Sequence, residues 1–138
     1  MGNVQKEGAT GLGLVVAVVG SRSVDYCPAL WRRLRELRPA LVVTGGAAGA
    51  DDDAQRCALA LGLSLATHLP DYRAHGQAAP LVRNGLVVAG ADLVLVVWDG
   101  QSRGTLDAAR KAARLGKRLE WLLHPAPSAT PVPGGLGL

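Results

Sequence analysis

The sequence of 138 residues contains no Phe, and its aromatic residues are limited to three Trp and two Tyr. Its apolar content is instead aliphatic, in runs rich in Val, Leu and Ala. Such runs predict strands that are buried on both faces and covered by helices. Charged residues make up 19% of the chain, too few for a disordered protein, and the length suits one domain with a core of its own.

Cysteine is scarce as well. Cys27 and Cys57 stand far apart, without a CxxC pair and without His at ligand spacing, which argues against a disulfide framework and against a zinc site. We expect both to be small buried hydrophobic side chains in a reducing compartment. The sequence predicts no metal site and no required cofactor.

Long hydrophobic runs are also missing. No apolar stretch approaches the ~20 residues that cross a bilayer, and the N-terminus has no basic segment followed by a long apolar run. These absences predict a cytoplasmic protein with no membrane partner. The formal net charge of +4 is ordinary for a small protein, and the Arg residues are spread over several predicted helices. Nucleic acid is therefore not expected as a partner.

Strand and helix patterns alternate along the chain. Strands are predicted at 14–19, 41–44, 63–68, 92–98 and 118–123, and helices at 25–39, 49–61, 81–87 and 105–115. This alternation predicts an α/β, Rossmann-like three-layer domain with a mostly parallel five-stranded sheet in the order 3-2-1-4-5. Residues 1–12 are expected to be a flexible lead-in, 13–123 the nucleotide-binding domain and 124–138 a disordered tail rich in Pro and Gly.

Three of the predicted strands run directly into glycine-bearing turns, and these strands are neighbours in the predicted order. Glycine lets the backbone approach a ligand, and the helix after each turn presents unpaired N–H groups and a positive dipole end. Since ligands of such sheets bind at the carboxyl ends of the strands, we expect a nucleotide or nucleotide derivative there, held through its phosphate. The candidate ligand-binding residues are Gly20, Ser21, Arg22, Gly45, Gly46, Ala47, Gly49, Asp51, Arg83, Asn84, Asp99, Gly100, Ser102, Gly104 and Thr105.

Simpler roles exist for the same residues. Neither GxGxxG nor GxxxxGK[ST] is present, and each glycine can serve only to turn the chain. Ser102 and Thr105 can cap a helix, and the acids 51–53 can complement a helix dipole. Tyr72 and Trp98 are candidates for stacking on a base. A binding site is therefore predicted from the convergence of three turns, because no single turn identifies one.

These residues resemble the SLOG superfamily and, within it, its YspA-like members. Four motifs occur in the family's order: Gly20-Ser21-Arg22, the turn from Gly45 to Asp51, Arg83-Asn84, and the segment from Trp98 to Thr105. The resemblance implies a Rossmann-like fold and the binding of nucleotides or nucleotide-derived signals, as a sensor or accessory protein. It also implies a homodimer or higher homo-oligomer, which relatives commonly form.

Two relatives of this superfamily supply alternatives. Resemblance to the cytokinin-activating phosphoribohydrolases implies cleavage of the N-glycosidic bond of a nucleoside monophosphate. Asp107 or an acid of the cluster 51–53 would then be the catalytic carboxylate, with Arg83 on the phosphate. Ala108 stands where their motif has Glu, which weakens that hypothesis. The DNA-processing protein A group binds single-stranded DNA, an alternative that here lacks interleaved aromatic and basic residues. We rank small-nucleotide binding first, hydrolysis second and single-stranded nucleic-acid binding third.

Overall fold

The computed structural model describes residues 13–122, so the predictions for 1–12 and 124–138 lie outside the described residues. The strands are β2 (Val15–Gly20), β3 (Leu41–Thr44), β4 (Leu65–Thr67), β5 (Leu93–Val97) and β6 (Arg118–Trp121). The helices are α1 (Pro28–Leu37), α2 (Ala50–Leu61), α3 (Tyr72–His75), α4 (Ala79–Ala89) and α5 (Arg103–Arg114), with a 3₁₀ turn, η2 (Gly76–Ala78), between α3 and α4.

All strand pairs in the sheet are parallel, and the strand order is β4-β3-β2-β5-β6. In chain order this is 3-2-1-4-5, which confirms the predicted α/β class, the parallel sheet and the topology. The central strand β2 pairs with β3 on one side and β5 on the other, as in Val16↔Val42 and Ala17↔Val94. The strand order therefore reverses between β2 and β5, where a ligand crevice is expected.

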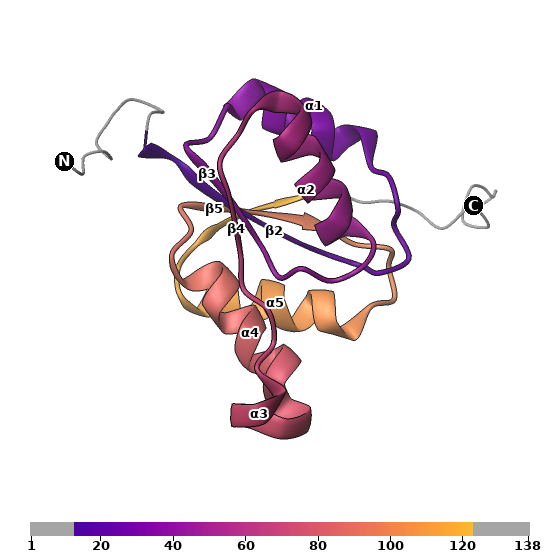
Figure 1. The fold of residues 1–138 in the computed structure, drawn as a ribbon, viewed down its shortest axis with the longest axis vertical. Helices are drawn as coiled ribbons and strands as arrows, with labels where there is room; N and C mark the ends of the chain where they lie inside the picture. Colours follow the sequence, from indigo (N-terminus) through magenta and orange to yellow (C-terminus); the bar gives the residue numbers. More distant parts are fainter. Residues whose placement is uncertain (1–12, 123–138) are drawn as a thin grey trace.

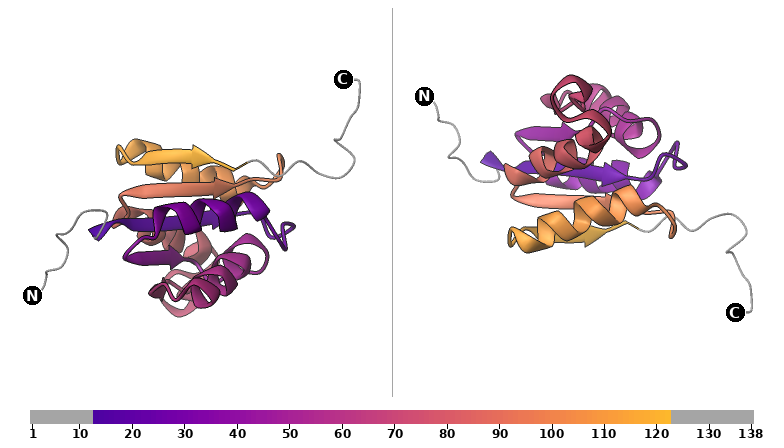
Figure 2. Two further views of the ribbon diagram at one scale, coloured as in Figure 1. Left: turned by 90° about the horizontal axis from the view of Figure 1, so that it is seen from above. Right: turned by 90° about the horizontal axis from the view of Figure 1, so that it is seen from below.

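The sheet is covered on both faces (Figure 1), with α1 and α2 on one side and α4 and α5 on the other, as the two views of Figure 2 also show. Alternate residues of β2 enter the two cores: Val16 and Val18 pack with Leu30 and Leu34 of α1. The other face of β2 packs with α4 and α5, whose side chains there are largely Val and Ala. Small side chains let these helices lie close to the sheet, so a core without Phe is densely filled.

Two elements differ from the sequence prediction. The predicted connection 70–79 contains α3 and η2, which project from the body of the fold at the foot of Figure 1. Asp71 caps α3, because its carboxylate accepts the Ala74 N–H at 3.0 Å. Helix α1 begins at Pro28 rather than at 25, in agreement with the preference of proline for the first helical turn.

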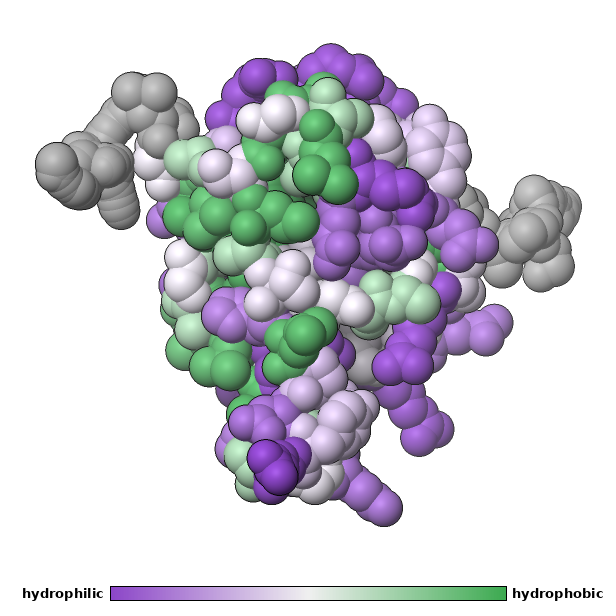
Figure 3. Space-filling view, viewed as in Figure 1, coloured by the Kyte–Doolittle hydropathy of each residue, from purple (hydrophilic) through white to green (hydrophobic). Residues whose placement is uncertain are grey.

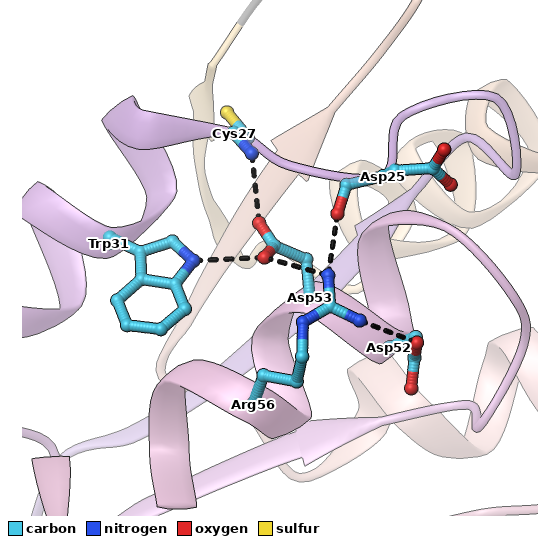
Figure 4. Close-up of polar contacts among 6 residues, drawn as sticks. All are labelled: Asp25, Cys27, Trp31, Asp52, Asp53 and Arg56. Atoms are coloured by element: carbon cyan, nitrogen blue, oxygen red, sulfur yellow. Dashed lines mark hydrogen bonds and ion pairs between the residues drawn. The ribbon is translucent and has the colours of Figure 1, made fainter. Parts of the chain in front are cut away.

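A buried acid ties α1 to α2 (Figure 4). Asp53 is fully buried, and its carboxylate accepts the Cys27 N–H and the Trp31 indole N–H, both at 2.9 Å, and a guanidinium N–H of Arg56 at 3.1 Å. Cys27 precedes α1 and has no side-chain cap of its own, so Asp53 serves as the cap from another helix. Both cysteines are buried and free, and burial raises the pKa of the Cys57 thiol to about 11.

The surface is unevenly polar. In Figure 3 hydrophobic residues gather toward the left of the view and hydrophilic residues toward the right, where β2 and β5 end in Figure 1. Within residues 13–122, no helix is both long and apolar enough to cross a membrane.

Candidate functional site

A cleft of about 410 Å³ opens at the carboxyl ends of β2, β3 and β5, and the turns after these strands meet in it. We refer to it below as the cleft. Helix α4 supplies one wall and α5 another, and the floor is apolar. The lining residues are Val18, Val19, Gly20, Arg22, Ser23, Gly45, Ala47, Asp51, Pro80, Leu81, Arg83, Asn84, Val87, Asp99, Ser102, Gly104, Thr105 and Ala108.

Most of the predicted ligand-binding residues line the cleft, and four do not. These four are Ser21, Gly46, Gly49 and Gly100. Ser21 is fully buried and joins the turns: its hydroxyl accepts the Asp99 N–H at 3.1 Å, and its carbonyl accepts the Ala50 N–H at 3.1 Å. It acts by holding the cleft together.

Gly49 lets the first two turns approach each other. Its φ is +80°, and a Cβ at this position would collide with the backbone of Arg22. The glycine is therefore required both by its positive φ, with ψ at −124°, and by the contact between the two turns.

Replacing Gly49 with Ala is expected to lower the free energy of unfolding by about 2–4 kcal/mol, because strain at positive φ adds to a steric clash. Gly62→Ala is the comparison: Gly62 lies in the αL region (φ +71°, ψ 28°), and nothing among residues 13–122 lies within 4 Å of an added Cβ, so only the αL backbone cost of about 1 kcal/mol applies. Urea unfolding of the two variants measures the difference. Equal losses would show that the Arg22 contact contributes nothing.

Two carboxylates of the protein accept hydrogen bonds from backbone N–H groups of the turns. Asp51 accepts the Gly45 N–H at 3.1 Å and the Ala47 N–H at 3.2 Å. Asp99 accepts the N–H groups of Gln101 and Ser102, each at 2.8 Å. The Ser23 hydroxyl donates to Asp99 at 2.6 Å, and this bond is the main cause that lowers the Asp99 pKa to about 2. These amides therefore stabilise the turns, and an anion in the cleft has to be held chiefly by side-chain cations.

Arg83 is the cation placed best for this. It lies on α4 with only 8% of its surface exposed, donates from Nη1 to the Gly45 carbonyl, and donates from Nε to Asn84 Oδ1 at 3.2 Å. Among residues 13–122, no carboxylate lies within 4.0 Å of its guanidinium. A buried charge without an ion pair is unfavourable, so an anion entering the cleft would be attracted to Arg83. Arg22, which is exposed, is the second cation of the lining.

Burial also acts on Asp51. Desolvation raises its pKa from 3.8 to about 6, against the opposing effects of the bond from the Ala47 N–H and the charge of Arg83. The folded protein therefore binds a proton on Asp51 more readily than the unfolded chain does.

For this reason the wild-type protein should lose about 2 kcal/mol of stability as the pH rises from 4 to 7, relative to Asp51→Asn. The sign follows from proton uptake: between the two pKa values the folded state binds more protons, so raising the pH favours unfolding. Urea unfolding of both proteins at pH 4 and pH 7 measures this change, and effects of other groups cancel in the comparison. Parallel pH profiles would contradict the elevated pKa.

Asp107, the acid considered for hydrolysis, lies outside the lining of the cleft. It accepts Asn84 Nδ2 at 3.1 Å and Lys111 Nζ at 2.9 Å, and so joins α4 to α5. Burial acts to raise its pKa, but the bonds from Lys111 and Asn84 leave the value below the ordinary one. Within the described part of the chain, no three His, Cys, Asp or Glu side chains gather as metal ligands.

The lining also includes residues that the sequence motifs did not predict. Ser23, Pro80 and Leu81 belong to it, and the signal was their position beside Gly20-Ser21-Arg22 and beside Arg83. Of the two aromatic candidates, Trp98 is held in place by a bond from its indole N–H to the Ser102 carbonyl at 3.1 Å. Tyr72 lies on the projecting α3 and is 58% exposed.

Comparison with known proteins gives three findings. No model of a known protein family matches the sequence. The chain is 35% identical over 112 residues to the Gene 61 protein of Mycobacterium phage D29, with 73% of this chain and 90% of that protein covered.

Among solved structures, it is similar to DNA processing protein A of Helicobacter pylori, studied for its single-stranded DNA binding mode (TM-score 0.61, 26% identity, 78% of this chain and 64% of that one). It is also similar in fold to DNA processing protein A of Streptococcus pneumoniae (TM-score 0.60, 17% identity, 78% of this chain and 50% of that one). The chain thus spans less than two thirds of either protein.

These findings correct two predictions. The expectation that the cleft takes a small nucleotide as its ligand was wrong, and so was the expectation that nucleic acid is not a partner, because the fold is shared with a protein studied for single-stranded DNA binding. The physical reason is that a net charge of +4 is a sum over the whole chain, whereas the binding of a polyanion depends on where cations gather on the surface. The solved structures support the predicted relation to DNA processing protein A, as a shared Rossmann-like fold.

Proposed function

The chain belongs to the family of the Gene 61 protein of Mycobacterium phage D29, and from this premise and its DNA-processing-protein-A-like fold we propose that it binds single-stranded DNA in the cleft. The observation that carries the proposal is the buried Arg83 guanidinium, which lines the cleft without a carboxylate within 4.0 Å among residues 13–122. A phosphate of the DNA backbone supplies the missing negative charge, and guanidinium binds phosphate through two parallel N–H bonds.

Further groups of the cleft fit a phosphate and its sugar. Arg22 adds a second, exposed cation at the rim. Gly104 lies in the first turn of α5, where helix N–H groups and the helix dipole favour an anion. Pro80 and Leu81 offer an apolar wall to the sugar or base. These groups would contact mainly the sugar-phosphate backbone of the DNA, so binding should depend little on base sequence.

An exposed aromatic residue lies on the helix that precedes the cleft wall in the chain. Tyr72 and the adjacent Arg73 lie on α3, which leads through η2 to Pro80 of the cleft wall. Both side chains are exposed, and an aromatic ring next to a cation is a combination that single-stranded DNA binders use for base stacking. From the motifs given above we also propose that the chain is a YspA-like member of the SLOG superfamily.

Fluorescence anisotropy with a labelled oligothymidylate of about 16 nucleotides tests the proposal. We expect saturable binding at low salt that weakens as salt rises. Arg22→Gln should reduce the magnitude of the negative slope of log K against log [salt] by about 0.7. Arg35→Gln, an exposed residue of α1 on the other face of the sheet, is the matched control and should leave the slope unchanged. Flat anisotropy for the wild-type protein at low salt would reject the function.

A further inference from the structure

The outer face of α5 carries a row of cations. Arg103, Arg110 and Arg114 are exposed, whereas the opposite side of the helix buries Thr105, Ala108, Ala109 and Ala112. At about 100° per residue, the three Arg positions fall within about 40° of one another around the helix axis. They therefore form one stripe that faces directly away from the sheet, and we call Arg103, Arg110 and Arg114 the basic row. The right-hand view of Figure 2 shows α5 lying lengthwise on the outside of the fold.

The charge of this region has one sign. Between residues 103 and 118 the sequence has six cations and one acid, Asp107, and that acid is paired with Lys111 at 2.9 Å. Within the described ranges, no member of the basic row has a carboxylate within 4.0 Å. A helix face that is merely solvated usually mixes both signs, whereas a one-signed row attracts a polyanion.

The basic row begins at the cleft. Arg103 stands between Ser102 and Gly104, and both of these neighbours line the cleft. From there the row runs along α5 for about 16 Å to Arg114, at about 1.5 Å of rise per residue. A cavity of about 410 Å³ is of the size that holds a single small molecule, so most of a bound strand has to lie outside it.

Building on the proposed function, we propose that the basic row is a second contact surface for single-stranded DNA. It binds the phosphates of the strand that extends out of the cleft past Arg103. Two consequences follow from this arrangement. Affinity should rise with oligonucleotide length until the strand covers the row, and the row should contribute to the salt dependence only for oligonucleotides long enough to reach it.

The test compares Arg110→Gln/Arg114→Gln with wild-type protein, using a labelled trinucleotide and an oligothymidylate of about 16 nucleotides. The control is Arg32→Gln/Arg35→Gln, which removes two exposed cations from α1 on the opposite face of the sheet. All four substituted side chains are exposed, so thermal unfolding should show every variant folded.

With the longer oligonucleotide, we expect the α5 variant to lose about 1.4 from the slope of log K against log [salt], at about 0.7 for each phosphate contact. With the trinucleotide it should bind like wild-type protein, and the α1 control should match wild type with both. The proposal is overturned if the α5 variant keeps the wild-type slope, or if the α1 variant loses as much. If either result is found while wild-type protein still binds, the proposed binding in the cleft remains supported. If wild-type protein binds no oligonucleotide, both the basic row and the proposed function are overturned.

Discussion

Arg83→Met is expected to weaken binding of single-stranded DNA by about 10- to 100-fold, because a charged hydrogen bond to phosphate is worth about 1.5–3 kcal/mol. The substitution keeps an unbranched apolar stem against the turn but removes the guanidinium that lines the cleft. Because this buried guanidinium also donates to the Gly45 carbonyl and to Asn84 Oδ1, its loss should also lower the free energy of unfolding by about 1–3 kcal/mol. Anisotropy titration at fixed salt measures the affinity, and thermal unfolding verifies the fold.

Arg83→Lys is the matched control for this prediction. Lysine keeps the charge but lacks the planar fork, so its affinity should fall between those of wild type and Arg83→Met. A folded Arg83→Met protein that binds the oligonucleotide as wild type does would remove Arg83 from the binding surface.

Asp53→Ala is expected to lower the free energy of unfolding by about 3 kcal/mol. The carboxylate is fully buried and accepts bonds from Cys27, Trp31 and Arg56 (Figure 4). Its removal leaves the buried Cys27 N–H without an acceptor and removes the hydrogen bonds of Asp53 that join the start of α1 to α2. Urea unfolding at neutral pH measures the loss.

Asp52→Ala provides the comparison on the same helix. Asp52 is 57% exposed in its side chain, and its one ion pair among residues 13–122 is with Arg56, at 2.6 Å, so its loss should stay within about 1 kcal/mol. Similar losses for the two variants would mean that the buried network contributes no more than an exposed ion pair.

Much of the fold could be predicted because its strands and helices are marked by runs and repeats of aliphatic residues. Continuous apolar runs such as Leu93–Val97 have the length and β-branched composition of strands buried on both faces. Helices α3 and η2 could not be found in this way, since they bury none of their residues and leave no apolar pattern. Asp71, which caps α3, was the one local signal for them.

The position of the site could be predicted from the sequence. Which of its residues face a ligand and which stabilise the turns could not. The strand order brings the three turns together, and that order is readable from the alternation of elements. The burial of Arg83 depends on Gly45, because a Cβ there would lie 2.7 Å from Arg83 Cδ. Likewise, Asp51 accepts hydrogen bonds from backbone N–H groups because of the conformation of the turn, and the sequence alone does not specify that conformation.

The ranking of functions failed for a related reason. Acids concentrate at the start of α2, as Asp51, Asp52 and Asp53, and they offset in the total charge the cations that gather on α5. Averaged over the chain, the excess is only +4, whereas segment 103–118 alone is strongly basic. Charge therefore has to be mapped onto elements before it can indicate a nucleic-acid partner.

The most direct test of the cleft as a DNA-binding site is a ¹H–¹⁵N NMR titration of the full chain with a short oligothymidylate. We predict that the Arg83 Nε–H and the backbone amides of Arg22 and Gly104 shift in a saturable manner, because these three residues line the cleft. The amide of Gly62, at the far end of α2, should not move. Saturable shifts elsewhere that leave the cleft resonances unchanged, or no shifts at low salt, would contradict the proposed function.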